Sequence, residues 1–304
     1  MIFCEMSFKY FDYPGKNRRP SPKEIGAKLH LDERTVRLRT AKMEKEGFIQ
    51  YYQTVPNLWL LGNPLASLYN FQATSVTAKR DALQKARDED DVIDIADFLG
   101  AGFGLTISAR TEQQAIEKAK MIAQHIGIET FQANPPRQFP QPRKSLDKLD
   151  WQIIKALRYH ALRPTKRIAE ELKITYRMAE YTIGKLFESR ALSTRAIINA
   201  SEPKGIIFYS LNLRLDEKLR HRAIHNLREI YGKRVWWHFS PPGQIVTLFL
   251  FATSIARAED DLIEALSKTG VLEGSMTIFK GWVEPRRPSW IDRRVQQMID
   301  SRPE

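Results

Sequence analysis

The sequence has few of the features that build disulfide-rich, metal-binding or membrane proteins. Its 304 residues include one cysteine, Cys4, which excludes a disulfide framework within the chain and a zinc site of clustered cysteines. Its longest apolar stretches, such as residues 245–252, are far shorter than the ~20 residues that a transmembrane helix needs. The first residues lack the small-residue cleavage site of a secretory signal. These absences predict a cytoplasmic protein that contacts no membrane and holds no metal or other cofactor.

Acidic residues are also in deficit, with 36 Asp and Glu against 48 Lys and Arg, a net charge of +12. The excess is uneven, because residues 1–55 carry +4 and residues 142–200 carry +7, whereas residues 56–141 carry −2 and residues 201–304 carry +3. Positive charge concentrated in two segments is typical of a protein that binds a polyanion, and double-stranded DNA is the expected partner. A basic, solvated surface is the alternative.

The two basic segments contain the same pattern. Residues 24–49 align without a gap with residues 167–192, and the apolar positions of the two segments coincide. This pattern predicts two short helices joined by a tight turn and followed by a strand, which is a winged helix-turn-helix present in two copies. The identical pairs are Ile25/Ile168, Leu29/Leu172, Arg34/Arg177 and Lys42/Lys185.

Local signals place the helices of these modules. Pro22 is suited to begin a helix that ends at Leu29, Asp32 to cap the next helix, and Gly47 to end it. In the second copy, Thr175 is suited to cap the last helix. A further helix is predicted before each pair, over residues 3–12 and 149–157.

A different kind of sequence follows each helical module. In both halves, strand and helix patterns follow the order βαββαβ, which is that of the ferredoxin-like fold. The fold class is therefore α+β, with two winged helix-turn-helix modules, each followed by a ferredoxin-like domain. The predicted elements of the first half are residues 66–76, 79–89, 92–98, 103–109, 112–126 and 129–133, and those of the second are residues 206–213, 217–231, 235–239, 245–253, 257–269 and 275–283.

These elements also define the domain boundaries. The tail has an apolar stripe at helical spacing (Ile291, Val295, Met298 and Ile299), which predicts a helix docked on the chain itself or on a partner subunit. Two copies in one chain predict a pseudo-dimer in which the sheet faces pack together. A homodimer of the chain is the alternative. The predicted domains are a winged helix-turn-helix (1–55), a ferredoxin-like domain (56–134), a proline-rich linker (135–144), a second winged helix-turn-helix (145–200), a second ferredoxin-like domain (201–285) and a helical tail (286–304).

The sequence resembles the Lrp/AsnC family of transcriptional regulators. The likeness rests on LDKLDWQIIKAL at residues 146–157, IAEELKI at residues 168–174 and SPKEIGAKLHLDERTVRLRTAKMEKEGFI at residues 21–49. In that family the last helix of the triad contacts DNA, and the ferredoxin-like half assembles dimers and can sense amino acids. The resemblance implies a sequence-specific DNA-binding regulator, not an enzyme, in which the family unit is duplicated.

The predicted DNA contacts lie on and around the last helix of each module. Arg34 and Arg37 are three residues apart on its exposed face, so both can enter one major groove. Glu180 stands at the position of Arg37 in the second copy, which predicts weaker base recognition there. Ion pairs within a helix, such as Lys42 with Glu46, are the alternative role. The full predicted set is Arg34, Thr35, Arg37, Arg39, Lys42, Lys45, Lys166, Arg167, Arg177 and Lys185.

An effector site stays unplaced. The resemblance directs attention to the turns at residues 99–104 and 240–243, but neither contains the aspartate that is typical there. The glycines of the first turn join two strands and open no helix, so they do not indicate a dinucleotide site. A small-molecule effector therefore remains an open expectation.

Two other functions are compatible with the sequence. Siroheme decarboxylases share this outline and bind a tetrapyrrole instead of DNA, so fold alone does not exclude an enzyme. Such an enzyme needs histidines and basic residues around a large pocket, and His221, His225 and His238 are the histidines considered. A surface histidine pair is the simpler interpretation of the first two. An RNA-binding or architectural protein would also explain the charge.

Overall fold

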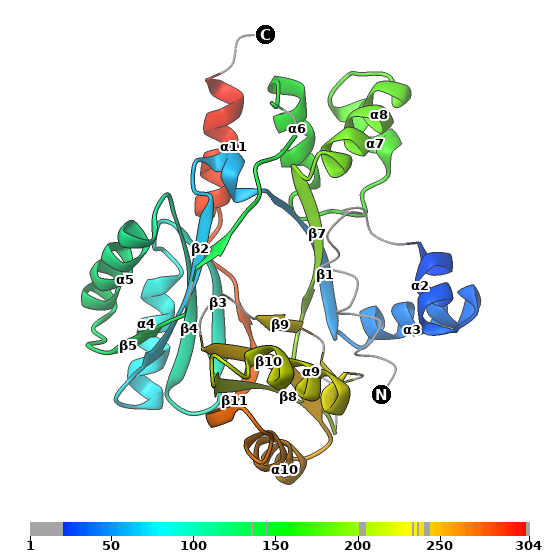
Figure 1. The fold of residues 1–304 in the computed structure, drawn as a ribbon. Helices are drawn as coiled ribbons and strands as arrows, with labels where there is room; N and C mark the ends of the chain where they lie inside the picture. The colour runs from blue at the N-terminus through cyan, green and yellow to red at the C-terminus, as the bar shows by residue number, and fades with distance from the viewer. Residues whose placement is uncertain are drawn as a thin grey trace.

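The computed structural model describes residues 21–134, 136–143, 145–200, 205–232, 234–235, 237–239 and 244–301, with side chains omitted at 28, 29 and 237–239. The helix predicted at residues 3–12, the turn at 240–243 and the His238 side chain lie outside this description. The chain is a mixed α+β structure with antiparallel sheets (Figure 1). None of the helices in the described part combines the length and hydrophobicity that crossing a bilayer requires.

The first helical module contains α2 (Pro22–Leu29), α3 (Glu33–Lys45) and strand β1 (Ile49–Pro56). The Asp32 side chain caps α3 by accepting from the Thr35 backbone N–H at 2.8 Å. The chain turns from α3 toward β1 at Gly47, whose φ of +75° is accessible to glycine at little cost. The predicted start of α2, the cap of α3 and the turn after it are therefore confirmed.

The second helical module contains α6 (Lys148–Leu157), α7 (Thr165–Glu171), α8 (Tyr176–Glu188) and β7 (Leu192–Ile198). Thr175 caps α8 as predicted. Strands β1 and β7 pair antiparallel in a two-stranded sheet, in which Tyr52 faces Ala196 and Gln53 faces Arg195. This ladder joins the two helical modules through their last strands.

A βαββαβ segment follows the first module. It consists of β2 (Leu65–Gln72), α4 (Val76–Ala86), β3 (Val92–Phe98), β4 (Gly102–Ala109), α5 (Glu112–Ile126) and β5 (Phe131–Ala133), after the short helix η1 (Leu58–Leu61). The strand order is β5-β2-β4-β3, and a core of buried apolar side chains joins the sheet to α4 and α5. Part of the predicted linker forms β6 (Arg137–Gln138), which pairs with β2.

The segment after the second module contains β8 (Ile207–Leu215), α9 (Arg220–Tyr231), β9 (Trp237–Phe239), β10 (Ile245–Ala252), α10 (Ile255–Leu266) and β11 (Val271–Val283), with the strand order β11-β8-β10-β9. Strand β11 pairs with β8 and then, from Phe279 to Val283, with β3. The two four-stranded segments thus join along an edge into one sheet. The sequence predicted that the two halves pack through the faces of their sheets. This prediction is wrong, because the two sheets are joined edge to edge by backbone hydrogen bonds between β3 and β11.

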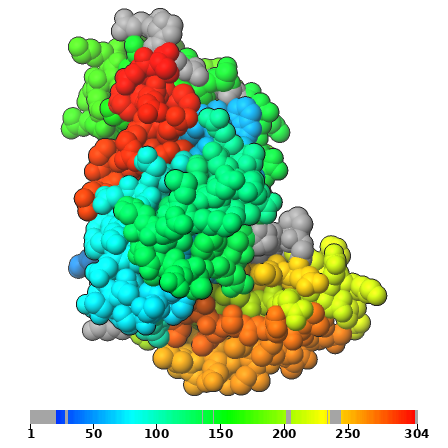
Figure 2. Space-filling view, turned by 90° about the vertical axis from the view of Figure 1, so that its left-hand side faces the viewer, coloured from blue at the N-terminus to red at the C-terminus, as the bar shows by residue number. Residues whose placement is uncertain are grey.

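Helix α11 (Trp290–Asp300) is formed by the C-terminal tail and docks on the chain itself. Trp290, Ile291, Val295 and Ile299 are buried in one core with α6 and η1. Arg294 also donates to the Leu61 carbonyl at 2.9 Å. Figure 2 shows α11 in red above the cyan and green surface of the first βαββαβ segment. The helix therefore connects the second helical module to the first half of the chain.

Candidate active site beside the hinge strands

Two adjoining cavities lie where β1, the α6–α7 connection and the segment after β11 meet. The larger is an open groove of about 680 Å³, within the size range of small-molecule sites. The smaller, of about 30 Å³, has room for roughly one water molecule. Tyr51 and Tyr159 line both, so their rings stand between the two. The groove is lined by Glu44, Ile49, Gln50, Tyr51, Tyr52, Tyr159, His160, Ala161, Leu162 and Arg163.

Arg158 ends α6 and is buried beside the smaller cavity. Its Nε donates to Asp292 at 3.1 Å and another guanidinium nitrogen donates to the Thr54 carbonyl at 2.8 Å. Burial lowers the pKa of Arg158, since it disfavours the charged form. An arginine nevertheless stays protonated at neutral pH, so Arg158 is a buried cation that links α6, β1 and α11.

Asp292 is the acceptor at the centre of these contacts. The Tyr159 hydroxyl donates to it at 2.6 Å and the Ser289 backbone N–H at 2.8 Å. Burial alone would raise the pKa of Asp292, but Arg158, Tyr159 and Ser289 together lower it below the ordinary 3.8. Burial, more than any other cause, raises the pKa of Tyr159. At neutral pH the pair is therefore a carboxylate and a phenol.

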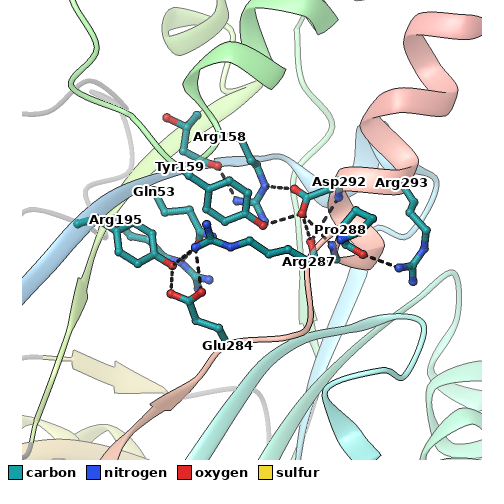
Figure 3. A network of polar contacts seen from close by, with 12 residues as sticks. Gln53, Arg158, Tyr159, Arg195, Glu284, Arg287, Pro288, Asp292 and Arg293 are labelled. Atoms are coloured by element: carbon teal, nitrogen blue, oxygen red, sulfur yellow. Dashed lines mark hydrogen bonds and ion pairs between the residues drawn. The ribbon is translucent and has the colours of Figure 1, made fainter.

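A second polar cluster joins Tyr51, Glu284 and Arg287, and the last two are labelled in Figure 3. Tyr51 donates its hydroxyl proton to Glu284, and Arg287 donates to the other carboxylate oxygen at 2.9 Å. The Arg287 guanidinium carbon lies 3.8 Å from the centre of the Tyr159 ring, which is a cation–π contact. Burial, followed by the contact with Glu284, raises the pKa of Tyr51 far above its ordinary 10. Tyr51 therefore remains a hydrogen-bond donor at neutral pH.

Arg195 on β7 completes the charged lining. It binds Asp94 of β3 through two nitrogens, at 2.6 and 2.9 Å, and donates to Gln53 at 2.9 Å. Burial is the largest single influence and by itself would lower the pKa of Arg195, but the charge and hydrogen bonds of Asp94, together with Tyr51 and Tyr159, raise this pKa above its ordinary value. Arg158, Arg195 and Arg287 thus each have a carboxylate partner within the chain. The cluster is rich in arginine yet balanced in charge.

The predicted DNA contacts lie elsewhere. The two sets are on α3 and on α7 and α8, which stand apart in Figure 1, and none of these ten residues lines either cavity. The Thr35 hydroxyl takes part in the α3 cap by donating to Asp32 at 2.5 Å. Arg39 is partly buried, and Arg34, Lys45, Lys166 and Arg177 are exposed. Four members pair within their own helices: Arg37 with Glu33 at 2.5 Å, Lys42 with Glu46 at 3.6 Å, Arg167 with Glu170 at 3.5 Å and Lys185 with Glu188 at 3.4 Å.

The histidines considered from the sequence do not form a metal site in the described residues. His221 and His225 are exposed on α9, and His225 lies 3.4 Å from Glu229. No cluster of His, Cys, Asp and Glu suited to a metal occurs within the described ranges.

Sequence reasoning did not bring the residues of the cavities together into one site. Tyr51, Arg158, Arg195, Glu284 and Arg287 are spread over most of the chain and belong to no common motif. One local signal was present: Arg158 directly follows the apolar face of α6, where a charged residue needs a partner if it is buried. The identity of that partner, Asp292, has no signature in sequence spacing.

Comparison with known proteins gives the fold of the whole chain. No family model and no curated protein matches the sequence. The crystal structure of the siroheme decarboxylase NirDL matches at 10% identity over 98% of both chains, with a TM-score of 0.59. Over its whole length, this chain shares the NirDL fold. A second NirDL structure, in co-complex with an iron-uroporphyrin III analogue, matches at 12% identity over 96% of both chains, with a TM-score of 0.58.

The regulators of the AsnC family match a smaller part. An AsnC family regulator from Agrobacterium tumefaciens covers 47% of this chain and 92% of its own, at 13% identity and a TM-score of 0.34. AsnC of E. coli covers 42% of this chain and 87% of its own, at 16% identity and a TM-score of 0.29. The prediction of a DNA-binding regulator that is not an enzyme is corrected by the match over 98% of this chain, because the protein matched there is a siroheme decarboxylase.

Proposed function

We propose that this chain is a tetrapyrrole-binding decarboxylase, acting on a substrate of the siroheme class in the groove between β1 and the α6–α7 connection. The observation that carries the proposal is the lining of this groove. Tyr51 and Tyr159 are half-buried and offer aromatic surface for a flat macrocycle, and Arg163 and His160 line the same groove. The whole-chain likeness to NirDL supports the same class of ligand.

Decarboxylation of a tetrapyrrole requires the protein to bind the substrate and to supply one proton. Siroheme is an iron tetrapyrrole with acetate and propionate side chains. In a non-oxidative decarboxylation the bond between the carboxylate and its neighbouring carbon breaks, carbon dioxide leaves, and the electron pair remains on that carbon. A proton then completes a methyl group, so that neither an oxidant nor a reductant is consumed.

The groove is lined by two side chains of types that transfer protons, His160 and Glu44, and Glu44 already accepts a hydrogen bond from the Tyr52 hydroxyl. We assign the proton transfer to His160, because its side chain is exposed in the groove and an imidazole can act as a general acid. Tyr51 and Tyr159 are poor acids because their pKa values are raised, so we assign them to hydrogen bonding and stacking. Arg163 already pairs with Glu171 at 2.5 Å, at the exposed edge where a ligand carboxylate can join it.

Binding can be tested with a charge placed in the groove. Leu162 lines the groove and is 41% exposed, so Leu162→Glu should leave the core intact and repel an anionic tetrapyrrole. We expect the wild-type chain to shift the absorption band of siroheme at micromolar concentration and the variant to bind at least about 10-fold more weakly, the effect of roughly 1.4 kcal/mol.

Leu38→Glu is the matched control, because Leu38 is exposed on α3 and lies outside both cavities. It should bind like the wild-type chain. If siroheme and uroporphyrin leave the wild-type spectrum unchanged, or if the two glutamate variants bind equally well, the groove is not a tetrapyrrole site.

We also propose that the two halves are copies of one winged helix-turn-helix plus ferredoxin-like unit, with the domain boundaries given above, forming a pseudo-dimer within the chain. The repeat places Arg195 at the position of Tyr52 and Ala196 at that of Gln53. The β1–β7 ladder pairs Tyr52 with Ala196 and Gln53 with Arg195. Replacing each residue of the first pair by its counterpart in the other copy gives the second pair. A pseudo-twofold axis between them would produce this register. The equal strand orders of the two halves also support it.

A further inference from the structure

The arginines beside the groove, which could bind the carboxylates of a tetrapyrrole, already form ion pairs with carboxylates of the chain itself. Arg158 pairs with Asp292, Arg195 with Asp94, and Arg287 with Glu284. Each of these guanidinium groups already binds an internal carboxylate, so a ligand carboxylate that binds here competes with one of the three acids. The structure distinguishes the three acids by how firmly each is held.

Asp94 and Asp292 are fixed by their surroundings. Asp94 is part of strand β3 and binds Arg195 with both oxygens. Asp292 forms the capping box of α11 with Ser289 in addition to its contacts with Arg158 and Tyr159. Displacing Asp292 would uncap α11 and leave the buried Arg158 without its carboxylate, and displacing Asp94 would break both of its hydrogen bonds with Arg195.

Glu284 is held more loosely. It follows the last residue of β11 and belongs to no helix or strand. Its side chain is 38% exposed, against 19% for Asp94 and 16% for Asp292. An ion pair at this exposure contributes little to stability, so its exchange costs little.

The surroundings of Glu284 would remain in place after such an exchange. The Glu284 carbonyl accepts from Arg87 at 2.9 Å, and the Arg286 N–H donates to the Arg87 carbonyl at 2.8 Å, so the backbone is anchored on both sides. The Arg287 guanidinium is supported independently by the Tyr159 ring at 3.8 Å. The side chain of Glu284 can therefore rotate away while Arg287 and Tyr51 keep their positions.

We propose that Arg287 and the Tyr51 hydroxyl form a seat for one carboxylate of the ligand, and that Glu284 fills this seat until the ligand replaces it. This inference rests on the proposed function. The seat adjoins the groove, because Tyr51 and Tyr159 border both cavities. A planar guanidinium and a phenol are suited to a carboxylate, since both donate to its oxygens. The seat holds a carboxylate that orients the macrocycle, because holding the one that leaves would stabilise the ground state.

Internal competition of this kind has a measurable consequence. Glu284→Gln keeps the size of the side chain and removes its charge. The uncharged side chain binds Arg287 less strongly, so the ligand carboxylate displaces it more easily. If the vacated state makes up about 10% of the wild-type population, the variant should bind uroporphyrin III up to about 10-fold more tightly. Arg287→Gln should instead weaken binding by about 10-fold or more, because it removes the cation of the seat.

Arg286→Gln is the matched control for Arg287→Gln. Arg286 is the preceding residue, pairs with Asp88 at 2.9 Å and does not line either cavity. Metal-free uroporphyrin III is the probe, followed by fluorescence in titrations of the full chain, and circular dichroism verifies that each variant is folded. Arg287→Lys provides a second variant, which keeps the charge but loses the flat stack and the forked geometry, and it should bind with intermediate affinity.

The outcomes separate this inference from the proposed function. Tighter binding by Glu284→Gln together with weaker binding by Arg287→Gln, but not by Arg286→Gln, supports the seat. If the wild-type chain binds uroporphyrin and Glu284→Gln binds it equally or less well, the displacement is wrong while the tetrapyrrole site stands. If neither the wild-type chain nor any variant binds the porphyrin, both proposals fail.

Discussion

Replacing Asp292 with alanine is expected to destabilise the folded chain by about 3–5 kcal/mol, the usual cost of removing one partner of a buried ion pair. Asp292 accepts from Arg158, Tyr159 and Ser289, and the first of these is a buried cation. The variant leaves that cation without its carboxylate and also removes the cap of α11. Denaturant unfolding of the full chain at pH 7 measures the loss.

Asp300→Ala is the control, because Asp300 lies on the same helix and its contact is with Gln296 at an exposed position. Its effect should stay within about 0.5 kcal/mol. A double substitution of Asp292 and Arg158 should cost less than the sum of the two single losses, since both remove one interaction. A loss below about 1 kcal/mol for Asp292→Ala would show that the pair is only a surface contact.

The destabilisation should depend on pH in a defined direction. The pKa of Asp292 is lowered in the folded chain, so the carboxylate contributes stability above its ordinary pKa of 3.8. That contribution is lost as the pH falls through the lower folded pKa. The gap between the wild-type chain and Asp292→Ala should therefore be full near neutral pH and should narrow below pH 3.8.

Replacing His160 with asparagine is expected to lower the rate of siroheme decarboxylation by roughly 10²–10⁴-fold, the typical contribution of a positioned proton donor. His160 is exposed in the groove, so the substitution leaves the buried Arg158–Asp292 pair intact. Tetrapyrrole binding should therefore persist. Loss of turnover with retained binding would place the histidine in the chemical step.

The loss of turnover should be specific to the histidine of the groove. His225→Asn is the control. His225 is an exposed histidine on α9 that pairs with Glu229, and it lines neither cavity. Equal turnover by the wild-type chain and His160→Asn would mean that the proton comes from another group.

Local structure followed closely from local sequence. The predicted spans of β3 and α5 match the structure at both ends, and the caps at Asp32 and Thr175 are those observed. Caps, glycine stops and apolar periodicity act over a few residues, so they can be recognised without knowledge of the fold. Charge patterning did not reveal which residues line the cavities, because the arginines predicted to contact DNA lie on α3, α7 and α8, outside both cavities, and no pattern connects Arg158, Arg195 and Arg287.

The sequence alone determined the order of helices and strands, the repeated helical pattern and the amphipathic C-terminal helix, because each depends on interactions between near neighbours. Only the tertiary structure decided which charges meet. Asp292 and Arg158 are 134 residues apart, and Arg195 and Asp94 are 101 apart. These pairs form because β1 pairs with β7, β3 pairs with β11, and α11 packs on α6. A groove built from such long-range contacts has no sequence motif, since no short segment contains more than part of it.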